Sequence, residues 1–386
     1  MGTSGRYAAV LCAGLVLAGL AGCTPDRQPS ARPAHSTARA EVSPSSGPFM
    51  SGPACEVTLP GGWRSALAAS EVKAPADAHA VLTEAGPDAQ WVAVQLTDGP
   101  RRRAALIPSG GSPRTLLNFA DPVEHQLLSA DFDGRRAAFA VLEGRSLSSP
   151  WSLYVWDARS GKARRLARST QPGPLPQPVL HKGRVYWAQG LGGGEAAVLR
   201  ASGDGSGKPR TLHTGVFDTP FAAGERLVWR EGNAEGTRLL ALSLDTERPI
   251  ALPGAIAELR DIRSAASDGR RWAWVDGEAE PRLRMWQQGV PAPTTAVTGA
   301  PSTEGADQLR VGGDLITWRT TEAAYALDLR ASSYARVTPQ YGYAQARSGT
   351  LAIAYSRGEA KSAQARAVIQ VARADRLRRL PGCDGA

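Results

Sequence analysis

A short pattern recurs roughly every 40 residues from residue 79 to the C-terminus, and it limits the chain to a repeat architecture. Each copy begins with a turn, usually one that contains glycine, and continues into a short strand that carries an aromatic residue. Six clear copies lie at residues 133–139, 183–187, 224–229, 268–274, 313–318 and 349–355, and a weaker copy without the glycine lies at 90–94. Seven copies therefore divide the body of the chain.

A second half follows each copy and consists of another strand, a turn and a closing strand. In the second unit, residues 153–157 lead through a turn at 160–162 to a strand that ends at 165–166. Apolar and polar residues alternate in these segments, which is the β-strand period. The 42 Gly and 28 Pro disfavour long helices. Each unit thus holds about four strands, too few to bury their own faces, so the units are expected to stack.

The combination of a glycine turn, an aromatic strand and a closing Arg-Leu strand resembles the TolB-like and WD-repeat-like β-propellers of bacterial envelope proteins. The resemblance covers roughly residues 55–383. It implies an all-β fold, a seven-bladed β-propeller with about four strands per blade. Blades are expected at residues 75–120, 121–170, 171–215, 216–255, 256–300, 301–340 and 341–382.

The first 22 residues predict export. Arg6 precedes an apolar stretch over residues 8–20, which is too short to span ~30 Å of hydrocarbon comfortably. The stretch ends in Leu20-Ala21-Gly22-Cys23, which resembles the lipobox of bacterial lipoproteins. Residues 1–22 are therefore interpreted as a lipoprotein signal peptide and Cys23 as the lipidated first residue of the mature chain. The alternative, an ordinary secretory signal with a chance cysteine, also exports the protein.

Residues 23–54 are rich in Pro, Ser and Ala and show no apolar period. Such a segment cannot bury enough apolar surface to offset the entropy lost on ordering. We therefore expect a disordered tether between the lipid and a propeller domain at residues 55–383.

The cysteine count supports an oxidising compartment. Of the four cysteines, Cys12 lies in the signal peptide and Cys23 carries the lipid, which leaves Cys55 and Cys383. A disulfide between these two is expected, and two unpaired buried thiols are the alternative. We expect residues 55–59 to add a strand to the last blade, so that the disulfide clamps the closure of the ring. Residues 63–70 are expected to form a short helix that caps one face.

The basic charge does not predict a nucleic-acid site. Lys and Arg number 45 against 36 Asp and Glu, a net charge of +9. The arginines are spread along the chain, and the densest run is Arg101-Arg102-Arg103. A solvated, arginine-rich surface is the simpler interpretation.

Tryptophan and histidine were the first candidates for ligand contacts. Four tryptophans at matching repeat positions predict packing between blades: Trp187, Trp229, Trp274 and Trp318. Trp63 and Trp151 lie off this pattern and are the better candidates to face a ligand. The histidines His79, His125 and His181 precede aromatic strands and could converge on Zn or Cu in a central channel, but surface or turn positions are favoured.

No metal or cofactor is predicted. The aspartate-glycine segments at residues 131–134 and 204–205 lack the spacing of a calcium loop and are interpreted as turns. The Gly-rich segment at 203–208 is interpreted as a hairpin loop. The sequence holds no nucleophile elbow, zinc-protease motif or phosphate-binding loop.

These observations predict a monomeric, non-catalytic binding or scaffold module, lipid-anchored on the extracytoplasmic face of the bacterial cell membrane. Its partner is expected to be an envelope protein, a peptide or a glycan, with no nucleic acid. One alternative is an extracytoplasmic enzyme, a glycan lyase, hydrolase or quinoprotein dehydrogenase, with candidate residues Asp131, Asp133, His125 and His181. Another is a ligand-sensing lipoprotein that acts with a membrane protein.

Overall fold

The computed structural model describes residues 50, 52–75, 78–233, 236–277, 280–299, 303, 306–357 and 366–383. The chain separates into two units, Met1–Ser45 and Ser46–Ala386, and the description below concerns the second. The predicted signal peptide, Cys23 and most of the predicted tether lie outside the described residues. Among the described residues, no helix has the length and apolar character needed to cross a membrane.

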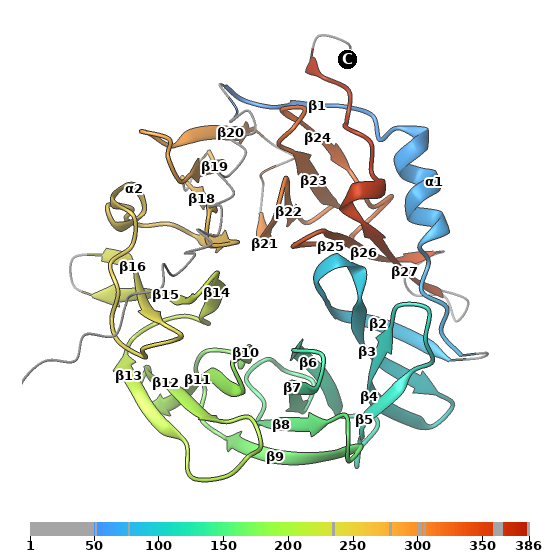
Figure 1. Ribbon diagram of the computed structural model, residues 1–386, viewed down its shortest axis with the longest axis vertical. Coiled ribbons are helices and arrows are strands. Elements are labelled where there is room, and N and C mark those ends of the chain that lie inside the picture. The colour runs from blue at the N-terminus through green and yellow to red at the C-terminus, as the bar shows by residue number, and fades with distance from the viewer. Residues whose placement is uncertain are drawn as a thin grey trace, which may run out of the picture. The chain divides into compact units, whose positions relative to one another are not determined.

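Seven small sheets stand in a ring, which is the arrangement of a seven-bladed β-propeller (Figure 1). Blade 1 holds β2 (His79–Ala85), β3 (Trp91–Asp98), β4 (Arg101–Pro108) and β5 (Arg114–Asn118). Blade 2 holds β6 (His125–Phe132), β7 (Arg136–Glu143), β8 (Trp151–Asp157) and β9 (Lys162–Ser169). Blade 3 holds β10 (Val179–His181), β11 (Arg184–Gly192), β12 (Glu195–Ser202) and β13 (Arg210–Gly215).

The remaining blades follow in chain order. Blade 4 holds β14 (Phe221–Ala223), β15 (Arg226–Asn233) and β16 (Gly236–Ser243). Blade 5 holds β17 (Ser264–Ser267), β18 (Arg271–Asp276), β19 (Arg282–Gln287) and β20 (Thr294–Thr298). Blade 6 holds β21 (Asp307–Gly312), β22 (Leu315–Arg319), β23 (Ala324–Asp328) and β24 (Ser333–Arg336), and blade 7 holds β25 (Gly342–Arg347), β26 (Thr350–Arg357) and β27 (Arg366–Arg373). The other elements are β1 (Cys55–Glu56), α1 (Gly61–Ala69), α2 (Gly254–Ala257) and the 3₁₀ turns η1 (Pro87–Ala89) and η2 (Ala374–Arg376).

The core lies between blades, because each sheet is covered by a neighbour on both faces. The middle strand β7 is buried continuously from Ala137 to Leu142 instead of alternating. The four tryptophans of the repeat pattern are buried, as predicted. Trp63 and Trp151 are buried as well, at 0% and 3% exposure, so the prediction that they face a ligand is wrong. In this protein, a tryptophan that lies outside the repeat pattern is therefore still part of the hydrophobic core.

Blade 4 departs from the four-strand expectation. The repeat pattern predicts a closing strand of this blade that ends at residues 250–252. The described residues instead form one bridge beyond β16, Leu242 to Pro249, flanked by backbone hydrogen bonds from Ser243 N–H to the Arg248 carbonyl oxygen at 2.9 Å and from Ile250 N–H to the Ala241 carbonyl oxygen at 3.0 Å. Pro249 has no N–H to donate to a ladder, and Pro253 precedes α2. The outermost strand is therefore reduced to a short contact at residues 248–250.

The N-terminal segment, residues 52–75, forms a strap across the outer edges of three blades (Figure 1). Ala54 N–H donates to the carbonyl oxygen of Ala296 in blade 5 at 2.7 Å. β1 then adds a fifth strand to blade 6, parallel to β24. This corrects the expectation that residues 55–59 join the last blade. Just before the strap, Met50 is buried in the core of blades 5 and 6, so ordered packing begins inside the predicted tether.

The last blade receives its fourth strand from the end of the strap. Glu71 pairs with Gln370 of β27 in an antiparallel bridge, and Val72 N–H donates to the carbonyl oxygen of Ile369 at 2.8 Å. α1 lies on the outer edge beside β27 and does not cap a face, because Trp63 and Leu67 fill the space between blades 6 and 7 (Figure 1). The ring is thus closed by the strap.

A disulfide fixes the strap to the C-terminal tail. Cys55 and Cys383 are bonded, with their Cα atoms 5.6 Å apart, as the cysteine count predicted. The tail is held on blade 6 by Asp328, whose carboxylate accepts from Leu380 N–H at 3.1 Å and pairs with Arg330 at 2.8 Å. Both ends of the propeller are therefore tied to blade 6.

Candidate functional site

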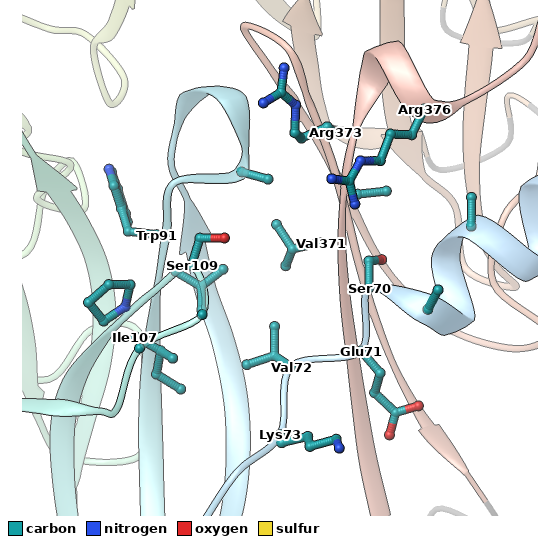
Figure 2. Close-up of a pocket in the computed structure, with 18 residues that line it drawn as sticks. Ser70, Glu71, Val72, Lys73, Trp91, Ile107, Ser109, Val371, Arg373 and Arg376 are labelled. Carbon is teal, nitrogen blue, oxygen red and sulfur yellow. The ribbon is translucent and has the colours of Figure 1, made fainter.

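A groove of about 540 Å³ lies at the seam where blade 7 meets blade 1 (Figure 2). We call it the seam groove. One wall is blade 1, including Val92, Ile107 and the turn at residues 109–111, and the other is β27 with Val371. The strap residue Val72 lies between the two walls, and Ser109 faces Val371 across the opening (Figure 2).

The seam groove exists because the fourth strand of blade 7 is so short. In blades 1, 2, 3, 5 and 6 a full outer strand fills the edge of the blade, but in blade 7 the described strap pairs with β27 only around Glu71. Gly110 and Gly111 add no side chains to the opposite wall. The result is an open cleft with an apolar interior, which is the common character of binding sites.

Cations gather on the rim of the seam groove. Its lining includes Lys73, Arg373 and Arg376 and one carboxylate, Glu71. Arg373 pairs with Asp375, and this hydrogen bond raises the pKa of the Arg373 guanidinium. Arg376 forms no ion pair within the described part of the chain, and its side chain extends from η2 back over β27 (Figure 2).

A half-buried ion cluster lies next to the seam groove on the innermost strands. Arg347 of β25 donates to the carboxylate of Asp131 at 2.7 Å and approaches Glu84 at 3.9 Å. Its guanidinium lies 5.5 Å from the ring centroid of Trp91, which lines the seam groove. Burial raises the pKa of the Glu84 carboxyl, although Arg310 and Arg347 act in the opposite direction. The cluster ties blades 7, 1 and 2 together across the closure of the ring.

The four candidate catalytic residues do not form one constellation. Asp131 accepts from Leu180 N–H of blade 3 at 2.8 Å as well as from Arg347, so its carboxylate joins blades. Asp133 accepts from two backbone N–H groups of its own turn, at 2.9 and 2.7 Å. His181 is hydrogen-bonded to Asp245, beyond blade 4's β16, while His125 lies against Phe119. Each of these side chains serves a local or cross-blade contact.

The metal candidates are not brought together either. His79 and His125 open their strands, whereas His181 ends its own. No group of three or more His, Cys, Asp or Glu side chains that could hold a metal ion occurs among the residues that the structure describes. Asp204 accepts hydrogen bonds from Ser202 and Ser206 within its own turn, and these bonds lower its pKa.

Sequence reasoning missed the seam groove and the ion cluster. Arg347 and Glu84 lie on innermost strands with no motif around them, and they meet only because the first and last blades are neighbours in the ring. The available signal was the weak first repeat, which begins with Gln90-Trp91 and lacks the glycine turn that precedes the aromatic strand in the other copies. Nothing in the spacing indicates that the strap would leave an open edge.

Comparison with known proteins gives the fold and nothing finer. No protein-family model matches the chain, and no curated protein sequence matches it. The β-propeller domain of the Trilobed protease from Pyrococcus furiosus, described as having an open velcro topology, aligns with a TM-score of 0.52 and 8% identity over 78% of this chain and 94% of that one.

Two further solved structures also align with the chain. An acylaminoacyl peptidase aligns with a TM-score of 0.52 and 10% identity over 77% of this chain and 51% of that one. TolB from Acinetobacter baumannii aligns with a TM-score of 0.43 and 10% identity over 64% of this chain and 63% of that one. The chain thus spans less than two thirds of either protein. At these identities the likeness concerns the fold alone, and the described chain is a seven-bladed β-propeller.

Proposed function

We propose that this protein is a non-catalytic binding module on the extracytoplasmic face of the bacterial cell membrane, where it binds a segment of an envelope protein in the seam groove. The lipobox-like Leu20-Ala21-Gly22-Cys23 supports a lipid anchor at Cys23. The disulfide between Cys55 and Cys383 suits an exported protein, because such bonds persist in oxidising compartments.

The seam groove is the observation that carries the proposal. Val92, Ile107 and Val371 offer an apolar interior, while Arg376 stands on the rim without an ion pair among the described residues. A peptide segment with an apolar side chain followed by a carboxylate matches both features. The surrounding blades are fixed by buried cross-blade contacts, so the groove is preformed and little ordering free energy is lost on binding.

The use of the polar side chains supports binding rather than chemistry. Three of the four sequence candidates for catalysis, Asp131, Asp133 and His181, are each engaged in a turn or in a contact between blades, and the fourth, His125, packs against Phe119. A residue that must hold two backbone or side-chain partners is poorly placed to exchange protons with a substrate.

The test is site-specific photo-crosslinking in cells. A photoreactive residue at Ser109 reports on the seam groove, and the same residue at Leu147, which is 64% exposed and outside the groove, is the matched control. We expect one dominant envelope protein to crosslink from position 109 and not from 147. Arg376→Glu, an exposed change that leaves the core intact, should abolish this product.

Three results would contradict the proposal. Equal products from both positions, or a product that Arg376→Glu leaves unchanged, would exclude the seam groove as the site. The absence of any protein product would favour a glycan or a small ligand. Labelling with a radioactive fatty acid tests the anchor separately. The variant Cys23→Ala should remove the label, and it leaves the propeller and the photoreactive position 109 unaltered.

A further inference from the structure

A second groove, of about 480 Å³, lies on the other side of α1 from the seam groove, between α1 and blades 6 and 7. Three guanidinium groups line it: Arg64 from α1, Arg336 from β24 and Arg357 from the end of β26. We call it the arginine groove. The helix separates the two grooves, since Ala66 and Ala69 line the first while Arg64 and Ala68 line the second.

Two of these arginines are held in place without being neutralised. Arg64 donates to the carbonyl oxygen of Leu59 at 2.7 Å. Arg336 donates to the carbonyl oxygens of Thr338 and Pro339 at 3.0 and 2.9 Å. Neither forms an ion pair with a carboxylate anywhere in the described ranges of the chain. Carbonyl oxygens orient a guanidinium but leave its full positive charge available to an anion.

Neighbouring arginines on the same two blades behave differently. Arg319, Arg330 and Arg347 pair with Asp307, Asp328 and Asp131 respectively. Within the arginine groove, the one described carboxylate contact is that of Arg357 with Glu71, at 3.9 Å and with the arginine side chain 66% exposed. An exposed pair of this length contributes little. The groove therefore concentrates positive charge that the protein itself does not compensate.

The floor of the arginine groove is apolar. Leu59, Leu67, Val337 and Ile353 line it beside the cations, and the Tyr355 ring lies at the same wall. An inorganic anion would use the arginines alone, whereas a phosphate attached to an apolar chain would use both features. Arginine forks match phosphate oxygens in geometry and charge.

We infer that the arginine groove binds a phosphate group carried on an apolar chain, as in an acidic phospholipid headgroup or a soluble phosphate ester. The site does not depend on the seam groove, and it adds a second, anionic ligand to the molecule. If the protein is anchored through Cys23, acidic lipids of the same membrane are available to it at high local concentration.

The test uses the full chain with Cys23→Ser, so that no attached lipid can insert. Titrations compare neutral phosphatidylcholine vesicles, vesicles with added phosphatidylglycerol, monomeric dihexanoyl phosphatidylglycerol and inorganic phosphate. The variant Arg64→Gln with Arg336→Gln removes the two uncompensated charges. The control, Arg114→Gln with Arg159→Gln, removes two exposed charges from blades 1 and 2 and leaves the same net charge.

We expect the groove variant to weaken binding of the short-chain lipid at least tenfold and the control to change it less than twofold. The same difference with phosphatidylglycerol vesicles identifies a membrane headgroup as the source, and its appearance with the monomeric lipid alone identifies a soluble ester. Equal losses in the two variants would show general attraction to a basic protein and overturn the inference. So would binding of inorganic phosphate alone, or no binding that depends on the groove.

Discussion

Trp63 is the side chain on which the strap depends most, and replacing it tests how the ring is closed. Its ring is 0% exposed and packs among Val57, Leu67 and residues of blades 6 and 7. Its Nε1 donates to the carbonyl oxygen of Arg378 at 2.6 Å, which ties the strap to the C-terminal tail. One residue therefore holds both terminal segments against the ring.

The expected loss can be worked from these contacts. Truncating a fully buried tryptophan to alanine costs about 4 kcal/mol, from lost burial and the cavity left behind. The hydrogen bond to Arg378 adds roughly 1 kcal/mol. Trp63→Phe keeps most of the packing and loses the donor, so it should cost about 1–2 kcal/mol. At about 2 °C per kcal/mol for a domain of this size, Trp63→Ala should lower the Tm by about 8–10 °C.

Thermal unfolding and hydrogen exchange together check this prediction. The amides of Val57 and Val72 donate to carbonyl oxygens of blades 6 and 7, so they report on the strap directly. In Trp63→Ala they should exchange well before the amides of blade 3, whereas Trp63→Phe should change their exchange only slightly. Wild-type protection of both amides in Trp63→Ala, with a Tm shift under about 2 °C, would refute the reasoning.

Three further predictions follow from the same structure. Cys383→Ser should lower the free energy of unfolding by up to ~6 kcal/mol in the chain-entropy model, because the bond spans 328 residues; denaturant titration under oxidising conditions checks it. Burial raises the pKa of the Glu84 carboxyl above its ordinary 4.5, so the protonated form stabilises the folded state at low pH, and this contribution is lost as the pH rises through the raised pKa. Glu84→Gln should flatten this part of the dependence of the free energy of unfolding on pH, measured by denaturant titration at several pH values. Gly312→Ala should destabilise by several kcal/mol, since the added Cβ would lie 2.4 Å from the backbone nitrogen of Arg347, whereas Gly254→Ala, with open space around it, should be tolerated in the same thermal assay.

The architecture was predictable because a propeller repeats the same pattern of turns and strands in each of its seven blades. A turn with glycine and an aromatic strand appear in each blade, so the chance agreement of one copy is outweighed by the others. Apart from β1 and the strap residue Glu71, the strands of blades 1 to 7 each lie inside the residue range expected for their blade. The disulfide was predictable by a different route, since only two cysteines remained after the predicted signal peptide and the predicted lipidation site were set aside.

The closure of the ring was not predictable from the pattern. Residues 55–59 read as a strand, but nothing local decides which blade edge a strand joins, and β1 pairs with β24 of blade 6 instead of the last blade. The burial of Trp63 could not be predicted from local sequence either. It stands outside the repeat, so its burial depends on contacts with residues more than 300 positions away, such as Arg378. Strap residues line both grooves, so neither groove could be predicted from the repeat pattern.

If the protein is anchored through Cys23, the strap determines how tension on the tether would reach the proposed binding site in the seam groove. Within the described residues, Met50 packs in the core of blades 5 and 6, Cys55 lies on blade 6, and Val72 lines the seam groove. If the protein is tethered through Cys23, a pull on the tether is first met at Met50 and Ala54. The disulfide at Cys55 then passes the load to the C-terminal tail and blade 6, before it can peel Glu71 from β27. Reduction of this bond should therefore expose the seam groove to tension on the tether, and in unanchored protein it should leave partner binding unchanged. A partner affinity that falls on reduction only in the anchored form would place the disulfide between the membrane and the site, and an equal fall in both forms would show that it merely stabilises the fold.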